Sequence, residues 1–444
     1  MPGSDPSGVL DLYSAAVPER FFKQLEKELG LAARQRVFTW PLVVWLMISQ
    51  RLDSKATLST AVQQVVQREP QALLSGHKRI LEGTVSCHTG AYSDARQALP
   101  VVVAERVADR VLDHLMQSRL ETLPGWNRRV FILDGSSLEM PHTPELAKAY
   151  PPDPKSHWPV LRILVAQELT TGLAERPCWG PMYGPKAVSE QALTEQLLDR
   201  LPGAAVLMGD INFGVFSVAF AGIRRGHEVL LRLQPNRAGV VGRGLSLQPG
   251  LDQQVCWRPS AYERKHHPDL PADACVPGRL IVQQVTASDG SRVTLYLFTT
   301  LPLTVEQLVR LYGQRWNVET DLRSLKRTVG LQVLHCKGAD MIAKELVLAF
   351  VGYNLVRAVM NAAAEEYKLD PRRLSFSRSQ DVVNAALPGL AAAATPAQYQ
   401  ARLRRLIQLV ASCKLPDRSA RGSTPRQVWG HGCKFTKRKV SHKT

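Results

Sequence analysis

Apolar and polar positions recur with different periods in different parts of the chain. Over residues 18–120, apolar side chains return every three or four positions, as in FFKQLEKELGL and VVVAERVADRVLDHL, which predicts short amphipathic helices. The polar connection RLDSKATLS at 51–59 separates two of them and is compatible with a helix-turn-helix. Small helical domains that do not bind DNA show the same pattern, so both interpretations stay open.

Strands dominate the next part of the chain. WNRRVFILDGSS, WPVLRILVAQEL, RPCWGPMYGPK and AAVLMGD are apolar or Gly/Pro-punctuated runs of the kind that forms strands. Helical spacing returns at 189–201, behind a Ser189 N-cap, and again at 212–226. Strands in series followed by helix, strand and helix indicate an α/β core.

Residues 228–300 are β-rich again, with a central stretch of loops that contains many Gly, Pro and His residues. Helices resume at Thr304, a candidate N-cap, and a second helix at 341–367 is apolar over a wide arc, which predicts deep packing. The apolar runs all fall well short of the roughly 18 residues of a membrane span, so we expect no membrane association.

Composition adds a strong positive charge to this picture. The 444 residues are 45% hydrophobic, enough for a large core, and carry a formal net charge of +17. Twelve Lys or Arg against one acid, Asp417, give residues 401–444 a net +11. Such a charge favours a polyanionic partner, nucleic acid before membrane. A basic tail that is only solvated has the same composition, so this alternative stays open.

The cysteines and the N-terminus indicate the compartment. The seven cysteines are scattered and contain no CxxC pair, which argues against a disulfide framework or a zinc ribbon and fits a reducing cytoplasm. The N-terminus has no basic segment followed by an apolar run, so we expect no signal peptide. A cytoplasmic protein is predicted.

Three carboxylates stand where ligands gather in α/β proteins. Asp134 and Asp210 each lie at the C-terminal end of an apolar strand, and side chains beyond such ends converge outside the sheet. Glu319 lies on the helix that follows Thr304, near its buried edge. Plainer interpretations exist, because Asp-Gly after a strand is commonly a turn and Asp210 can cap the next helix.

The helix LYGQRWNVETDLRSLKRTVGL favours the chemical interpretation. At about 100° per residue, one apolar stripe forms the core face. Its members are Leu308, Leu311, Leu322, Leu325 and Val329. A polar row falls within about 60° along one side of that stripe. This row consists of Tyr312, Arg315, Glu319 and Lys326.

A simple ion pair does not account for this polar row. Arg315 and Glu319 at i and i+4 gain a few tenths of a kcal/mol on a surface, which leaves Lys326, about 10 Å further along the axis, unexplained. A cleft for metal ions and phosphates accounts for all of it. Glu319 is then a hard oxygen ligand, Arg315 and Lys326 contact phosphates, and Tyr312 donates a hydrogen bond.

The spacing of the polar row resembles the Y-R-E-K signature of the IS-four (insertion sequence four) family of DDE transposases. Asp134 in ILDGSSLEMPHTPE and Asp210 in VLMGDINFG resemble the first and second acids of that family, and SCHTGAYSDARQALP at 86–100 resembles a block that precedes its core. The resemblance covers about 85–365. The chain departs from the family at Ile211, which often is Arg, and at Pro-His-Thr-Pro, which often is Pro-Asp-Thr-Pro.

The resemblance implies a fold and a domain order. The fold is an α/β RNase H-like catalytic core, a mixed sheet flanked by helices, with an inserted β domain between the second Asp and the Glu. The implied segments are a helical DNA-end-binding region at 1–124, the first part of the core at 125–227, the inserted β domain at 228–302, the second part of the core at 303–368 and a basic C-terminal region for dimerisation or DNA contact at 369–444.

The resemblance also implies a reaction. Asp134, Asp210 and Glu319 become the catalytic triad that binds two Mg²⁺ ions, which Mn²⁺ can replace. A homodimer in a synaptic complex, associated with the nucleoid, binds double-stranded transposon ends at their inverted repeats. It cleaves them through a hairpin and joins the 3′-OH to target DNA. Trp316 matches a position near a flipped base, although a core Trp is equally compatible, and Trp257 is a weaker stacking candidate.

Two alternatives keep the fold and change the function. A domesticated protein would bind DNA without cleaving it, and a structure-specific nuclease would cleave without strand transfer. The presence of all three acids and of the complete polar row gives no sign of lost catalysis, which disfavours the first alternative. The inserted β-rich block and the helix with the Y-R-E-K signature disfavour the second.

Overall fold

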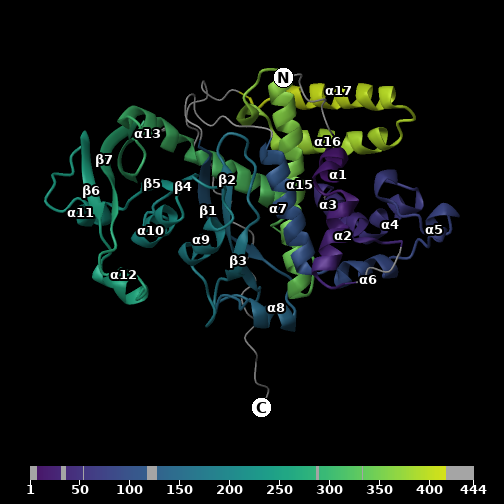
Figure 1. Ribbon diagram of the computed structural model, residues 1–444, viewed down its shortest axis with the longest axis horizontal. Helices are drawn as coiled ribbons and strands as arrows, with labels where there is room; N and C mark the ends of the chain where they lie inside the picture. The colour runs from purple at the N-terminus through teal and green to yellow at the C-terminus, as the bar shows by residue number, and fades with distance from the viewer. Residues whose placement is uncertain are drawn as a thin grey trace, which may run out of the picture. The chain divides into compact units, whose positions relative to one another are not determined.

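The computed structural model describes residues 8–31, 37–53, 55–117, 128–286, 290–332 and 334–416 (Figure 1). Contacts between residues divide the chain into two compact units. The sheet unit comprises Glu121–Thr170, Pro177–Thr320 and Pro416–Thr444, and the helical unit comprises Met1–Leu120, Thr171–Arg176 and Asp321–Leu415. From residue 417 on, the basic tail expected from the sequence lies outside the described residues.

One eight-stranded sheet in the order β3-β2-β1-β4-β5-β8-β7-β6 forms the centre of the sheet unit. β1, β4 and β5 are mutually parallel, and the strands on either side of them are antiparallel. The strands are β1 (Val130–Glu139), β2 (Val160–Glu168), β3 (Cys178–Pro181), β4 (Val206–Gly209), β5 (Glu228–Arg232), β6 (Leu251–Trp257), β7 (Val276–Thr286) and β8 (Arg292–Thr299). The prediction of an α/β core with a mixed sheet is confirmed.

The strands expected in an inserted β domain continue this same sheet. β8 pairs antiparallel with β5, and β7 and β6 follow outward. β8 thereby covers backbone groups of β5 that would otherwise form an open sheet edge. β5 itself pairs in parallel with β4 and so belongs to the central strands. The five-segment division given by the resemblance stays a prediction.

Two helices of the sheet unit, α9 and α13, begin at the N-caps that the sequence indicates. Ser189 accepts a hydrogen bond from the Ala192 N–H at 3.1 Å, and Thr304 accepts one from the Gln307 N–H at 3.3 Å. α9 packs against β2 and β3, and α10 packs against β5 and β7. The helices are α8 (Pro144–Ala149), α9 (Glu190–Leu198), α10 (Phe216–Arg224), α11 (Pro235–Val241), α12 (Ala261–His266) and α13 (Val305–Gly313).

Trp257 and two cysteines differ from the expectations for the β-rich stretch. Trp257 is buried, with its ring 4.9 Å from Phe298 and 6.1 Å from Phe216, so it is a core residue that cannot stack on DNA bases. Cys256 and Cys275 form a disulfide, which the scattered cysteine pattern did not predict. The four other cysteines in the described ranges are free thiols, as expected.

The segment after Thr304 is helical but irregular, whereas the sequence predicted one continuous α-helix. After α13 come a 3₁₀ turn, η2 (Gln314–Trp316), then α14 (Asn317–Arg323), then a π-helical turn, η3 (Ser324–Thr328). The predicted core stripe is confirmed, because all five members are at most 7% exposed. The helical-wheel position predicted for Lys326 does not hold, however, because it assumes about 100° per residue and a π turn changes that angle.

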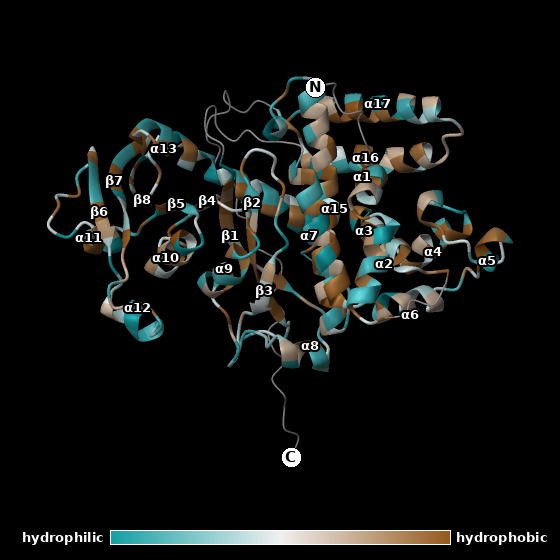
Figure 2. Cartoon of the chain, viewed as in Figure 1, coloured by the Kyte–Doolittle hydropathy of each residue, from teal (hydrophilic) through white to brown (hydrophobic). Residues whose placement is uncertain are grey.

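The long helix α15 (Ala339–Glu366) forms the core of the helical unit. By length and composition it could cross a membrane, and Figure 2 shows hydrophobic residues interspersed with hydrophilic ones along it. However, 89% of its apolar 18-residue window is buried inside the structure, as in a core helix. It packs against α1, α3, α7, α16 and α17. The other helices are α1 (Val9–Ala16), α2 (Glu19–Glu28), α3 (Trp40–Leu52), α4 (Leu58–Val66), α5 (Lys78–Leu81), α6 (Gly90–Ala98), α7 (Val101–Gln117), α16 (Phe376–Ala391) and α17 (Pro396–Ser412), with the 3₁₀ turns η1 (Gln71–Leu73) and η4 (Pro371–Arg373).

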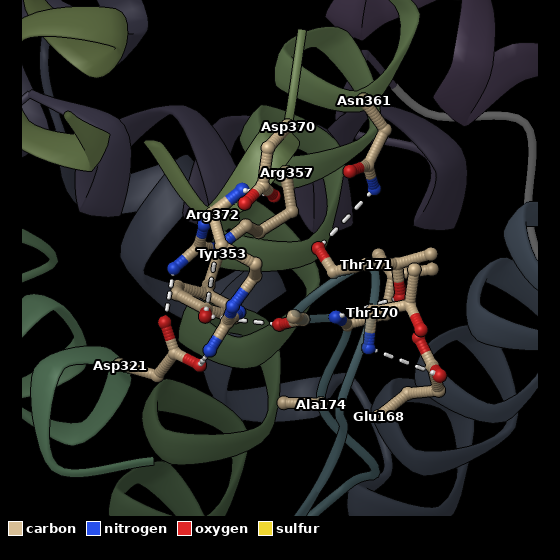
Figure 3. Close-up of polar contacts among 12 residues, drawn as sticks. Glu168, Thr170, Thr171, Ala174, Asp321, Tyr353, Arg357, Asn361, Asp370 and Arg372 are labelled. Carbon is tan, nitrogen blue, oxygen red and sulfur yellow. Dashed lines mark hydrogen bonds and ion pairs between the residues drawn. The ribbon is translucent and has the colours of Figure 1, made fainter. Parts of the chain in front are cut away.

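A buried polar network surrounds Asp321 in the helical unit (Figure 3). The Asp321 carboxylate, 1% exposed, accepts hydrogen bonds from the guanidinium groups of Arg357 and Arg372, the latter at 2.6 Å. The Arg357 Nε also donates to the Tyr353 hydroxyl at 2.9 Å, which in turn donates to the Gly172 carbonyl at 2.9 Å. Because each charge has an opposite partner, this burial is electrostatically compensated.

The block at 86–100 forms α6, whose C-terminal end is capped by a buried lysine. Lys344 donates to the carbonyl oxygens of Arg96, Gln97 and Leu99 at 2.9, 3.1 and 2.8 Å. These carbonyls are among those that a helix end leaves without intrahelical partners, and a cation there also interacts favourably with the helix dipole. The structure thus gives this block a packing role against α15.

Candidate active site

Asp134 lies on β1, and Asp210 directly follows Gly209, the last residue of the neighbouring parallel strand β4. β1 and β4 pair as far as Ile132 opposite Met208, so each aspartate comes two residues after the last pair, and the charge of Asp210 acts on Asp134. Residues at the same level on neighbouring strands point to the same face of a sheet. The two carboxylates therefore stand side by side, as expected from the strand ends.

Arg232 extends this row onto a third strand. β4 and β5 pair with Gly209 opposite Leu231, so the next residues along, Asp210 and Arg232, are level. Asp134, Asp210 and Arg232 form a row of two carboxylates and one guanidinium across β1, β4 and β5, which we call the Asp-Asp-Arg row. Sequence reasoning missed Arg232. The signal was present, since EVLLR ends an apolar strand on a charge as ILD and LMGD do.

The two plainer interpretations of the aspartates are not supported. Asp134 lies within β1, opposite Val165 of β2, and β1 continues to Glu139, so Asp-Gly is no turn here. What ends near Asp134 is the parallel pairing of β1 with β4. Asp210 does not cap α10, whose N-cap is Val215. Asp210 instead accepts a hydrogen bond from the Asn212 N–H at 2.9 Å and so orders the loop after β4.

The environment of Asp134 opposes its ionisation. Burial, and next the negative charge of Asp210, raise the pKa of Asp134 to about 6. The positive charge of Arg315 and the Gly135 N–H, which donates to Oδ1 at 2.9 Å, act in the opposite direction without cancelling the effect. A half-buried carboxylate whose pKa is raised beside a second carboxylate is a functional-site signature.

The segment from α13 to α14 brings two members of the polar row, Tyr312 and Arg315, under the influence of Asp210. Arg315, whose side chain is 13% exposed, donates to the Glu319 carboxylate at 2.8 Å. Burial opposes the charge of Arg315, but Glu319, Tyr312 and Asp210 outweigh it and raise its pKa. Burial raises the pKa of the Tyr312 phenol, against the opposing charges of Arg315 and Arg232. Tyr312, Arg315 and the Asp-Asp-Arg row thus share one electrostatic environment.

The remaining predicted residues are placed differently. Glu319 is engaged by Arg315, and within the described ranges no three His, Cys, Asp or Glu side chains are grouped closely enough to hold a metal. Lys326 lies in η3, within the helical unit. Trp316 is 66% exposed, with the Arg315 guanidinium 5.3 Å from its ring centre, which excludes the core interpretation.

A second residue that sequence reasoning missed is Glu190, the first residue of α9. The negative charge of Glu190 contributes to the raised pKa of Asp134, so its carboxylate is near the aspartate pair. It lies in the first turn of α9, where acids are common because they interact favourably with the helix dipole. Periodicity gives no signal that separates such an acid from a functional one.

Comparisons with known proteins point to one class. The family model described as transposase DDE domain matches residues 125–355. The transposase InsG for insertion sequence element IS4 of Escherichia coli (strain K12) is 26% identical over 429 residues, which are 93% of this chain and 90% of that protein. A solved synaptic complex of piggyBac transposase with hairpin DNA covers 94% of this chain and 88% of its own, with 11% identity and a TM-score of 0.42. The family match contains the whole Asp-Asp-Arg row and Glu319.

Proposed function

The chain belongs to the transposase DDE domain family, whose model spans more than half of it, and from this premise we propose how its residues carry out the reaction. It is a DDE transposase, an enzyme of DNA transposition, and its similarity to the transposase InsG agrees with the IS-four resemblance of its sequence. The observation that carries the proposal is the Asp-Asp-Arg row beside Arg315.

DDE transposases use divalent metal ions, and the aspartate pair has the chemistry to hold them. Asp134 and Asp210 supply the carboxylate oxygens that Mg²⁺ prefers, and a cation would offset the repulsion that raises the pKa of Asp134. We propose Asp134, Asp210 and Glu319 as the ligands of two Mg²⁺ ions, which Mn²⁺ can replace. In the part of the chain that the structure describes, Glu319 pairs with Arg315 and is not grouped with the aspartates, so it would have to leave Arg315 to complete this set. When bound, such ions activate the attacking oxygen and stabilise the leaving one.

The cations around the aspartates would orient the DNA backbone. The charges of Arg315 and Arg232 both act on Tyr312, and Arg315 also interacts with Asp210, so a phosphodiester next to the metal ions would meet guanidinium donors here. Tyr312 would donate a hydrogen bond to the same group. Lys326 is assigned a further phosphate contact, and the exposed ring of Trp316 a contact with a nearby base.

The partners follow from the family and from the charge of the chain. We propose that a homodimer binds two double-stranded transposon ends at their inverted repeats, with residues 1–124 in end recognition, and that it works in the bacterial cytoplasm on the nucleoid. Within that synaptic complex it would cleave through a hairpin and transfer the 3′-OH to target DNA. The net charge of +17 supports such a polyanionic partner.

A cleavage assay with labelled transposon-end DNA and Mg²⁺ or Mn²⁺ tests this proposal. We expect Glu319→Gln to abolish cleavage and to leave DNA binding in a gel-shift assay largely intact, because the change removes a ligand charge and keeps the shape. Glu195→Gln on α9 is the matched control, since Glu195 is exposed and outside the site. Cleavage by Glu319→Gln at the wild-type rate would show that the site assignment is wrong. Wild-type cleavage without strand transfer would indicate a nuclease instead.

A further inference from the structure

The carboxylate of Glu190 fills a space next to the first aspartate that only a glycine leaves open. A Cβ atom at position 135 would lie 2.0 Å from the Glu190 Oε1, far inside van der Waals contact. Gly135 directly follows Asp134 in β1 and donates its N–H to Asp134 at 2.9 Å. The backbone that holds Asp134 and the side chain of Glu190 are therefore packed directly against one another.

The same carboxylate is connected to the loop of the second aspartate. The Asn212 side-chain amide donates to the Glu190 Oε2. The Asn212 backbone N–H donates to Asp210 Oδ1 at 2.9 Å, so one residue contacts both carboxylates. Gln191 fixes the orientation of Asn212, since its Nε2 donates to the carbonyl of Asn212 at 2.7 Å and to its Oδ1 at 3.1 Å.

The base of Glu190 is itself fixed to the sheet. Ser189 caps α9, and Arg162 of β2 donates to the Val188 carbonyl at 3.0 Å just before it. Burial, and to a smaller degree the charge of Asp210, raise the pKa of Glu190, against the opposing charge of Arg162. A third carboxylate at this place is unfavourable electrostatically, so stability alone does not account for it.

We infer that Glu190 is a positioning residue that spans the backbone after Asp134 and the loop after Asp210 and so sets the separation of the two aspartates. This inference rests on the proposed function, because that separation matters only if the pair binds metal ions. Hydrogen-bonded partners behind metal ligands typically change metal affinity by about 10–100-fold when they are removed. If Glu190 positions the two aspartates through hydrogen bonds and packing, its role depends on the shape of its side chain. If Glu190 were a direct metal ligand, its role would depend on its negative charge.

Two substitutions separate these roles in the full-length protein. Isothermal titration calorimetry without DNA measures the affinity of each variant for Mn²⁺. Cleavage assays then give two further values for each variant: the Mn²⁺ concentration at half-maximal cleavage and the cleavage rate at saturating Mn²⁺. We expect Glu190→Ala to weaken Mn²⁺ binding by about 10-fold or more, while Glu190→Gln, which still accepts from Asn212, stays within about threefold of wild type. Glu195→Ala on the same helix is the matched control and leaves Mn²⁺ affinity unchanged.

The outcomes distinguish this inference from the proposed function. Unchanged Mn²⁺ affinity in Glu190→Ala overturns the inference. A loss of Mn²⁺ affinity in Glu190→Gln as large as that in Glu190→Ala also overturns it, because the residue would then act as a metal ligand. Asp134→Asn tests the metal site independently, and unchanged Mn²⁺ binding in that variant overturns the proposed function. If Glu190→Ala does not fold, Asn212→Ala at an exposed position removes the side-chain amide that joins Glu190 to the loop of Asp210 and keeps the backbone N–H that donates to Asp210. Unchanged Mn²⁺ affinity in that variant overturns the inference equally.

Discussion

Replacing Asp134 by Asn is expected to stabilise the metal-free protein at neutral pH. The pKa of Asp134 is raised to about 6 from its ordinary 3.8, chiefly by burial and next by the charge of Asp210. The folded protein therefore binds this proton more tightly than the unfolded chain does, and ionising the carboxyl group lowers the free energy of unfolding. Asparagine has nearly the same shape and carries no charge, so it removes this cost.

The magnitude and the pH window follow from the two pKa values. The interval from 3.8 to about 6 is equivalent to about 3 kcal/mol, at about 1.4 kcal/mol per pH unit. The cost is absent below pH 3.8, grows as the pH rises through this window, and is complete above about pH 6. Asp134→Asn should thus raise the free energy of unfolding by up to about 3 kcal/mol at pH 7.5 and by almost nothing near pH 4.

Thermal unfolding in EDTA measures this difference. For a unit of this size, about 3 kcal/mol corresponds to a rise in Tm of about 6–10 °C at pH 7.5. Asp269→Asn, an exposed position in the same unit, is the control and leaves Tm unchanged. Added Mg²⁺ should raise the Tm of the wild type and not that of Asp134→Asn, because the ion offsets the same repulsion. A variant that is no more stable than the wild type at pH 7.5, or equally stabilised at pH 4 and 7.5, would refute this reasoning.

Three further predictions concern other parts of the chain. Asp321→Ala leaves two buried guanidinium groups without their carboxylate and should lower the free energy of unfolding by about 3–5 kcal/mol in urea titrations. Asp199→Ala breaks an exposed pair and should lower it by less than about 1 kcal/mol; equal losses would contradict the argument from burial. Lys326→Ala should weaken DNA binding and reduce the salt dependence of log Kd by about one unit in gel shifts, whereas an unchanged slope excludes a phosphate contact. Trp257→Ala should lower the free energy of unfolding by about 3–5 kcal/mol, and a Tm equal to that of the wild type would argue against its core position.

Local sequence patterns were sufficient for the parts of the fold that local forces decide. The N-caps Ser189 and Thr304 and the apolar stripe from Leu308 to Val329 follow from hydrogen bonding and periodicity within a few residues, and the structure has them as predicted. The continuous helix through Lys326 was wrong, because the segment adopts 3₁₀ and π turns. Apolar periodicity does not encode such changes of pitch.

The parts that depend on strand register could not be predicted in the same way. Arg232 joins the aspartates only because β1, β4 and β5 lie next to one another in a parallel register, with connections of many residues between them. The alternation of apolar and polar residues predicts which face of the sheet each side chain of a strand points to. It does not predict which strand lies next to it or how the residues of the two strands are paired. Trp257 is a similar case. Its burial depends on Phe298 and Phe216, which are distant in sequence.

The surroundings of the buried Asp321 and of the half-buried Asp134 argue for different origins. Asp321 is met by two arginines, so its burial is compensated and contributes to one well-defined packing of the helical unit. Asp134 has Asp210 and Glu190 beside it, and Arg315 offsets only part of their charge. A chain that folds only for stability would not collect like charges in a half-buried place, because each one lowers the free energy of unfolding at neutral pH. A divalent cation would remove that cost and use the same carboxylates as ligands, which is the reason that we propose the Asp-Asp-Arg row, rather than the better-paired Asp321, as the catalytic centre.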